Sequence, residues 1–350
     1  MSWSEIAATP LPFANGAILF LGVLLYALLG GADFGGGIWD LLASGPRAAA
    51  QREVIARAIG PIWEANHVWL IFVIVLAFTV FPPVFAALSI ALYLPFSLAL
   101  LGIVFRGGAF IFRAPARGIA HTAWDRVFAI ASTVTPVFFG MAAGAVASGQ
   151  IRIVAGRVES DLWTTWLAPF PLAVGLIALT VCAYLAAVYL TLETSGELQE
   201  DFRARALVSG LALAALAAIV LPITRSDAPV IWDGLTAKAP VALPLVIGLA
   251  LLSGWAVFYR HYRLARAAAV GEVVVLLAGW VWAQYPYLIV PDLTFQEAAA
   301  SPAMQRAALI VFGLGAVLLI PSLWLLYRVF KRDLPGAAPL SSEPQPAGHD

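Results

Sequence analysis

The stretch that decides the fold is residues 14–42, ANGAILFLGVLLYALLGGADFGGGIWDLL, which is mostly apolar and contains no lysine or arginine. A helix needs about 20 consecutive apolar residues to cross the hydrocarbon core of a bilayer. Across the 350 residues of the chain, 62% are hydrophobic and only 11% are charged, whereas soluble domains carry about 25% charged residues. The sequence therefore predicts an all-α, polytopic membrane protein. The net charge of zero gives no indication of nucleic-acid binding.

Apolar segments of similar length recur along the chain and are separated by turn-forming Gly and Pro residues. They predict about nine transmembrane helices in a single transmembrane domain, residues 1–330. The predicted spans are roughly 14–42, 53–80, 84–106, 124–148, 162–192, 204–224, 240–261, 268–290 and 306–330. The tail, residues 331–350, is rich in Pro, Ser and Gly, and we expect it to be disordered.

The distribution of basic residues predicts the orientation of these spans. If the N-terminus lies outside, fifteen of the 20 Lys and Arg residues fall in inner loops and the tail. Cytoplasmic loops of membrane proteins are enriched in Lys and Arg. The bias predicts an N-out, C-in topology with an odd number of spans and a cytoplasmic tail.

Two acids lie inside predicted spans, Asp33 in the first and Glu64 in the second. An acid at the centre of a membrane helix costs about 2.5–3.5 kcal/mol to insert, so it indicates function by default. Asp33 is nine residues before Leu42, near the inner end of its span, and Glu64 is nine residues after Ile55, near the inner start of its span, which is about 13 Å at 1.5 Å per residue. This common depth would place the two carboxyl groups within reach of each other or of one water chain. The pattern predicts a proton relay.

A structural interpretation of these polar residues is also open. The glycines between Gly30 and Gly37 are typical of close helix packing, and Asp33 could bond to backbone that they expose. His67 follows Glu64 by one helical turn, and it could be a hydrogen-bonding core residue, a member of a proton path or a haem ligand. Arg106 ends the third span, where it could either neutralise one of the acids or anchor the helix at the interface.

Haem ligation by this chain alone has little support in its histidines. Of His67, His121, His261 and His349, only His67 lies well inside a predicted span. A six-coordinate haem needs two axial ligands, commonly His or Met, and no convincing pair is present. We find no residue pattern for a metal site, a phosphate loop or a nucleophile–His–acid set. We therefore expect no cofactor, metal or catalytic residue in this chain alone.

Four motifs, in this order along the chain, resemble subunit II of cytochrome bd-type quinol oxidases. They are Gly31–Gly37 (GADFGGG), Pro61–Ile71 (PIWEANHVWLI), Phe105-Arg106 and Tyr189–Leu198 (YLTLETSGEL). The second motif is the most specific. The resemblance is clear over residues 15–205 and rests on length and span pattern beyond them.

The resemblance implies a fold of two four-helix bundles plus one peripheral helix, and a role in a respiratory terminal oxidase of the bacterial inner membrane. The family's heterodimer takes electrons from quinol and reduces oxygen to water, generating voltage. Its haems, two of type b and one of type d or a third b, are held by the larger subunit I. Small single-span subunits and a bound quinone are further candidate partners.

The resemblance also assigns residues. Glu64 matches the acid that lines a cytoplasmic proton path in the family, where some members carry Asp. Asp33 matches the family's Gly-x-Asp position, and His67 completes the predicted proton-path set, with Trp63, Asn66 and Arg106 supporting it. Two rival interpretations remain at this stage: a proton-coupled secondary transporter, which would also carry intramembrane acids, and a purely structural scaffold.

Overall fold

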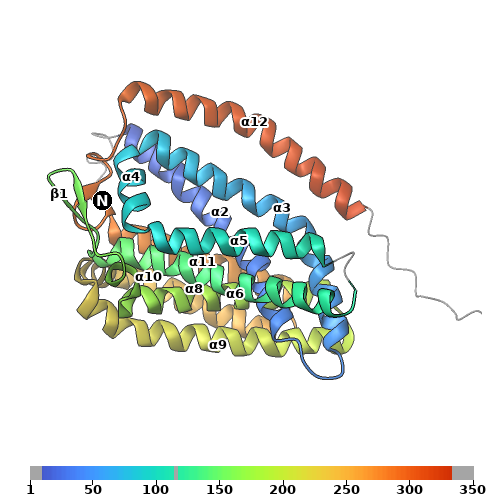
Figure 1. Cartoon of the computed structure of the whole chain (residues 1–350). Coiled ribbons are helices and arrows are strands. Elements are labelled where there is room, and N and C mark those ends of the chain that lie inside the picture. The colour runs from blue at the N-terminus through green and yellow to red at the C-terminus, as the bar shows by residue number, and fades with distance from the viewer. Residues whose placement is uncertain (1–9, 114–116, 333–350) are drawn as a thin grey trace, which may run out of the picture.

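Long helices make up almost all of the protein (Figure 1). The computed structural model describes residues 10–113 and 117–332, and within these ranges the side chains of 59–65, 326–327 and 329–332 are not described. The helices are α2 (Pro10–Leu41), α3 (Ala48–Val80), α4 (Pro82–Ala91), α5 (Tyr93–Phe112), α6 (Ile119–Ser148), α7 (Thr164–Leu167), α8 (Pro169–Glu193), α9 (Gly196–Asp227), α10 (Pro229–Phe258), α11 (Tyr262–Gln284) and α12 (Pro302–Arg332). The strands are β1 (Arg152–Val154), β2 (Arg157–Glu159), β3 (Tyr287–Ile289) and β4 (Leu293–Thr294).

The helices form two four-helix bundles with one helix at the periphery. Helices α2, α3, α5 and α6 make the first bundle, and α8, α9, α10 and α11 make the second. Contacts of α8 with α2 and α6 join the two bundles. Helix α12 lies along the outside of the first bundle, against α2 and α3 (Figure 1). The predicted architecture is confirmed.

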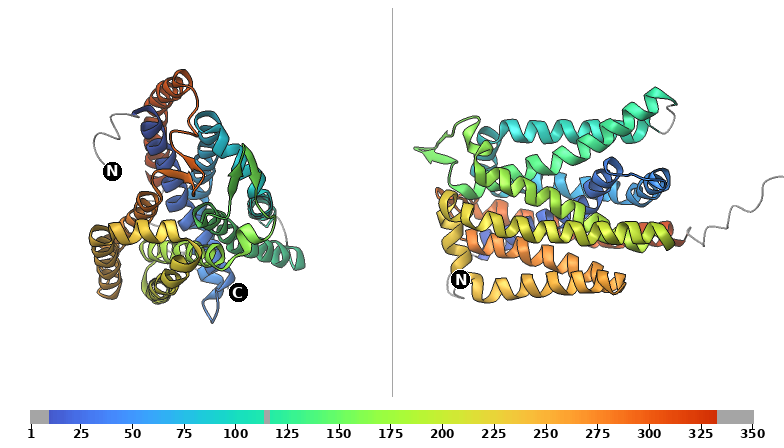
Figure 2. Two further views of the ribbon diagram at one scale, coloured as in Figure 1. Left: turned by 90° about the vertical axis from the view of Figure 1, so that its left-hand side faces the viewer. Right: turned by 90° about the horizontal axis from the view of Figure 1, so that it is seen from below.

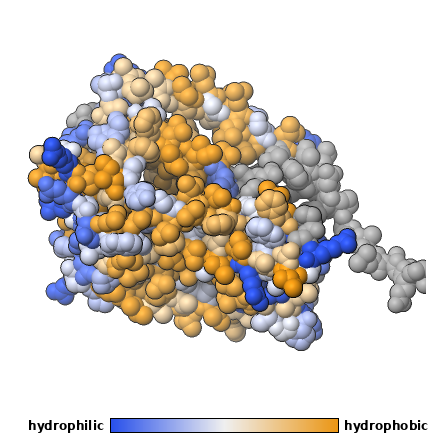
Figure 3. All heavy atoms as spheres, in the orientation of Figure 1, coloured by the Kyte–Doolittle hydropathy of each residue, from blue (hydrophilic) through white to orange (hydrophobic). Residues whose placement is uncertain are grey.

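Within the described ranges, eight helices are long and apolar enough to cross a membrane. The apolar part of α3, from Asn66 to Val80, makes a ninth candidate span together with α4, to which it is bent by 118°. Apolar side chains cover much of the outer surface (Figure 3), and the most apolar stretch of α12 buries none of its residues inside the chain. Such surfaces need to be covered by lipid or by a partner subunit. The prediction of about nine spans is confirmed.

Prolines set several helix boundaries, and some of these differ from the predicted ones. Helix α4 starts at Pro82 because the residue before a proline disfavours helical backbone. The predicted span 84–106 is divided between α4 and α5 at Leu92. The predicted span 162–192 is divided at Ala168, whose backbone is extended before Pro169. The predicted span 268–290 begins earlier, at Tyr262, and its helix ends before Tyr285-Pro286.

The two ends of the bundle differ in structure (Figure 2). One, the hairpin end, carries the antiparallel pairs β1–β2 and β3–β4. The other, the loop end, carries the short turns that follow α2, α5, α8 and α10. The carboxylate of Asp292 ties the two hairpins together by accepting bonds from Arg152 Nε at 2.9 Å and from the Ile153 N–H at 2.6 Å. The predicted tail lies outside the described residues from 333 onward, and α12 extends to Arg332.

The glycine-rich segment of α2 allows that helix to touch its neighbours. A Cβ atom built on Gly35 would lie 1.9 Å from the backbone oxygen of Cys182 in α8. No side chain could be accommodated there without separating the two helices. Close packing, as the glycines predicted, is therefore what joins the bundles at this level.

Candidate functional site: a buried ion pair at the centre of the first bundle

Asp33 and Arg106 form an ion pair in which neither side chain is exposed to solvent. Arg106 Nη1 donates to Asp33 Oδ2 at 2.8 Å, and Nη2 donates to Asp33 Oδ1 and, at 3.1 Å, to the Asp33 backbone oxygen. The guanidinium thus grips both carboxylate oxygens, the two-point geometry that makes arginine pairs specific. Of the two roles open for Arg106, it neutralises an acid and does not anchor at the interface.

The remaining helices of the first bundle reach the same pair. Arg106 Nε donates to Ser132 Oγ of α6 at 2.8 Å, and the guanidinium lies 4.9 Å from the ring centre of Phe34 and 5.1 Å from that of Phe128. From α3, Asn66 Nδ2 approaches Asp33 Oδ2 at 3.4 Å, a long contact. One polar cluster therefore touches α2, α3, α5 and α6.

The ion pair is energetically favourable only while both of its charged partners are present. Removing two charges from water costs several kcal/mol for each ion, and mutual attraction with complete hydrogen bonding repays that cost. Breaking such a pair by removing one partner typically destabilises by about 3–5 kcal/mol. The cluster therefore fixes the relative position of four helices at about 12 Å from the loop end, since Asp33 is eight residues before the end of α2.

The structure places the other predicted residues on α3, close to this cluster in sequence. Asn66 is fully buried beside Asp33, and His67, the next residue, is half-buried. Trp63 and Glu64 lie in α3, but their side chains are outside the described set. The contact expected between the carboxyl groups of Asp33 and Glu64 stays a prediction.

Two buried acids were missed by the sequence analysis, and both lie in transmembrane helices. Asp40 is 4% exposed near the end of α2, with its carboxylate 3.9 Å from Arg52 Nε. Glu272 in α11 is 7% exposed and lies beside Tyr184 of α8, with its Oε2 3.3 Å from the Tyr184 hydroxyl. Glu272 fell four residues after the start of the predicted span 268–290, and it was assigned no role from the sequence. An acid inside an apolar run was the signal that could have found it.

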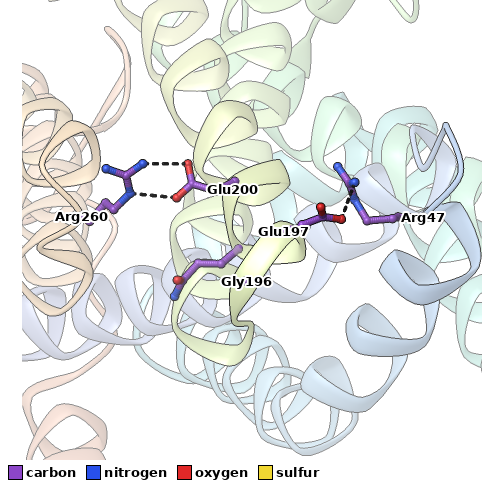
Figure 4. Close-up of a pocket in the computed structure, with 6 residues that line it drawn as sticks. Arg47, Gly196, Glu197, Glu200 and Arg260 are labelled. Atoms are coloured by element: carbon purple, nitrogen blue, oxygen red, sulfur yellow. Dashed lines mark hydrogen bonds and ion pairs between the residues drawn. The ribbon is translucent and has the colours of Figure 1, made fainter.

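A charged network at the loop end connects the two bundles. Arg47, in the turn before α3, donates to Asp201 of α9 through Nε at 2.9 Å and Nη2 at 2.6 Å. This hydrogen bonding to Asp201 raises the pKa of Arg47. Figure 4 shows the open depression beside it, in which Arg47 faces Glu197 and Arg260 faces Glu200. Both acids belong to the first turns of α9 and already have cationic partners, so the depression resembles a solvated ion-pair network more than a ligand site.

Metal ligands do not cluster in the part of the chain that the structure describes. There, no three His, Cys, Asp or Glu side chains lie close enough together to hold a metal ion. The three described histidines lie apart in the fold: His67 is in α3, His121 is in the first turn of α6, and His261 precedes α11. His121 pairs with Asp125 at 3.0 Å.

Comparison with known proteins identifies the family. The family model for cytochrome bd terminal oxidase subunit II matches residues 11–330. The chain belongs to the cytochrome bd terminal oxidase subunit II family. It is therefore an integral multi-pass membrane protein and a subunit of a bd-type terminal oxidase, as the four motifs indicated.

Individual relatives agree with this assignment. The chain is 24% identical over 338 residues to the cytochrome bd ubiquinol oxidase subunit 2 of Bacillus subtilis, a match that covers 93% of this chain and 96% of that protein. It is 30% identical over 203 residues to the cytochrome bd-I ubiquinol oxidase subunit 2 of Escherichia coli, covering 55% and 52%. Its fold matches a chain of the bd oxidase from Geobacillus thermodenitrificans with a TM-score of 0.79 at 23% identity, covering 92% of this chain and 99% of that one.

Proposed function

We propose that this chain is the haem-free subunit II of a bd-type quinol:oxygen oxidoreductase. In this proposal it supports a haem-bearing subunit I and contributes to the path that brings cytoplasmic protons to the site of oxygen reduction. Its family and its relatives, two of them named ubiquinol oxidase subunits, support the quinol oxidase assignment. The observation that carries the structural part is the Asp33–Arg106 pair, which holds the four helices of the first bundle in one arrangement.

The haem-free part of the proposal rests on where the histidines lie. His121 and His261 are at helix ends on the loop side, and His67 is the one described histidine that is well inside a helix. Two axial ligands facing one haem are needed for a six-coordinate site. We therefore assign the haems, two of type b and one of type d or a third b, to subunit I, and we assign none to this chain.

Within the proton path, we assign different roles to the two predicted acids. Asp33 is gripped by a guanidinium on both oxygens, so its part is to position the helices. Asn66 contacts Asp33, and this contact holds the α3 segment that also carries Glu64 and His67. Glu64 is then the group that takes up and releases protons, with His67 one turn further along and Trp63 beside it in sequence.

The orientation proposed for the chain places the loop end in the cytoplasm. The basic residues there include Arg47 and Arg260 in the turns and Arg52 near the start of α3, and the cytoplasmic side of membrane proteins collects such residues. Protons would then enter from the loop end, on the side of the membrane from which oxygen reduction consumes them. The exposed apolar faces are left for lipid, for subunit I, for small single-span subunits and for a quinone.

The test compares the purified wild-type complex with complexes that carry substitutions of Glu64. We expect the tagged chain to copurify with a haem-bearing partner, and Glu64→Gln to leave the haem spectrum intact while slowing quinol-dependent oxygen reduction strongly. Glu64→Asp should be milder because it retains a carboxyl group. Glu159→Gln, an exposed position in β2, is the matched control.

Two results would contradict the proposal. Wild-type turnover and charge generation in Glu64→Gln would limit Glu64 to a packing role. Loss of a haem band in an assembled His67→Ala complex would refute the haem-free assignment. Solute transport by the isolated chain in liposomes, without any haem partner, would favour the proton-coupled secondary transporter instead.

A further inference from the structure

The second bundle contains its own buried polar cluster, formed by Glu272 of α11, Tyr184 of α8 and Ser253 of α10. All three side chains are buried, with exposed fractions of 7%, 4% and 0%. Glu272 is ten residues from the start of α11, or about 15 Å from the loop end, and Tyr184 is nine residues from the end of α8, or about 14 Å. The cluster therefore lies at nearly the same depth as the Asp33–Arg106 pair.

The contacts form one continuous chain of oxygen atoms. Glu272 Oε2 is 3.3 Å from Tyr184 Oη, and Tyr184 Oη is hydrogen-bonded to Ser253 Oγ. Ser253 Oγ donates to the backbone oxygen of Ala265 at 3.3 Å. Since Ala265 lies in α11, seven residues before Glu272, the chain starts and ends on the same helix and passes through α8 and α10.

Counting hydrogens along this chain relates the three contacts to the state of the carboxyl group. Each hydroxyl has one hydrogen to donate. When Ser253 gives its hydrogen to Ala265, the Tyr184–Ser253 bond uses the hydrogen of Tyr184. Tyr184 then has only lone pairs left for Glu272, and the contact between them needs a hydrogen on the carboxyl group.

An ionised Glu272 would require a different pattern. Its carboxylate would take the hydrogen of Tyr184, Ser253 would turn its own hydrogen to Tyr184, and the Ala265 oxygen would lose its side-chain donor. The carboxylate would also lack a counter-ion, because no cationic side chain among the described residues pairs with Glu272. Asp33 differs in having Arg106. A buried carboxylate without a partner cation is strongly disfavoured, and such groups neutralise instead.

We propose that Glu272 is a proton-binding site of the second bundle and that it is protonated in the folded protein at neutral pH. Its carboxylic acid then donates to Tyr184, Tyr184 donates to Ser253, and Ser253 donates to the backbone oxygen of Ala265. The ligand is one proton, shared within a chain that ties three helices without any net charge. This site is separate from the path proposed for Glu64 and does not depend on it.

Infrared spectroscopy of the purified oxidase complex tests the proposal directly. We expect Glu272→Gln to remove a protonated-carboxyl C=O band that is present in the wild-type complex at pH 7. Tyr184→Phe removes the acceptor, so the same band should move to higher wavenumber. Glu297→Gln is the matched control: Glu297 accepts bonds from the N–H and hydroxyl of Thr294, which lower the pKa of its carboxyl, so this variant should remove carboxylate bands only.

Stability gives a second readout. The amide of Gln can donate to Tyr184 as the acid does, so Glu272→Gln should unfold at the wild-type temperature, whereas Glu272→Leu should unfold at a lower one. Loss of carboxylate bands with no change among the protonated-carboxyl bands in Glu272→Gln would overturn the proposal. If Glu272→Gln does not assemble, an unshifted protonated-carboxyl spectrum in Tyr184→Phe overturns it in the same way.

Discussion

Removing the guanidinium of Arg106 should destabilise the first bundle more than any other single change to its polar residues. In Arg106→Met the side chain keeps a comparable volume, but Asp33 is left fully buried with Asn66 as its remaining side-chain contact. Breaking one partner of a buried pair costs about 3–5 kcal/mol. This corresponds to about two to four orders of magnitude in the unfolding equilibrium constant.

The double variant Asp33→Leu/Arg106→Met separates the cost of a broken pair from the value of the pair itself. Replacing both charges by apolar side chains removes the desolvation cost together with the attraction, and such replacements are often neutral or stabilising. We therefore expect the double variant to be more stable than Arg106→Met alone. Neighbouring residues in one network are non-additive for the same reason.

The assay is unfolding of the purified complex in a denaturing detergent series, with each variant compared with the wild type. Ser132→Ala, which removes one bond to Arg106 Nε, is the graded control, with an expected loss of about 1 kcal/mol. The reasoning is refuted if Arg106→Met costs less than the Ser132→Ala control, or if the double variant loses the sum of the two single effects.

Two other predictions follow from the packing and from the hairpin end. Gly35→Ala should separate α2 from α8 and reduce the yield of assembled complex, because its Cβ would lie 1.9 Å from the Cys182 oxygen. The control is Gly248→Ala, which should assemble normally because nothing lies within 4 Å of its added Cβ. Equal yields of the two variants would contradict the packing argument. Hydrogen bonds from the Arg152 side chain and the Ile153 N–H lower the pKa of the Asp292 carboxyl in the folded protein. The carboxylate therefore contributes its full stabilisation above the unfolded pKa of about 3.9, and this stabilisation is lost as the pH falls through the lower pKa of the folded protein. Thermal unfolding measured between about pH 5 and pH 2 should therefore be less pH-dependent in Asp292→Asn than in the wild type, and identical profiles would show that the tie between the hairpins adds nothing.

The sequence predicts the architecture well because lipid imposes a simple rule on it. Apolar length and the absence of charge locate the spans, and backbone hydrogen bonding inside lipid leaves helices as the structure for such segments. The boundaries were less accurate at Ala168 and Tyr285. At each of these residues a proline follows, and its effect on the preceding backbone decides whether an apolar run is one helix or two.

The sequence identified the residues of the polar site, but it did not show which of them pair with each other. Asp33 and Arg106 are 73 residues apart, and composition alone could not tell whether Arg106 faces the bundle or the interface. That choice depends on the rotation of α5 about its axis, which packing fixes. Glu272 shows the opposite failure. The start of α11 was predicted six residues too late, which placed this acid close to the predicted end of its span, and it was not singled out.

The two bundles meet one requirement in different ways. In each, polar contacts between helices act alongside van der Waals packing to hold the helices together in lipid. The first bundle uses an ion pair, in which Arg106 binds both carboxylate oxygens of Asp33. The second uses neutral groups, so its acid can keep a hydrogen and donate it. The proton transfer that we propose for the first bundle is therefore assigned to Glu64, a carboxyl group other than the one bound by Arg106. If Glu64→Gln turned over normally while Arg106→Met stayed folded and lost turnover, this division of roles would be wrong, and the ion pair itself would have to take part in proton transfer.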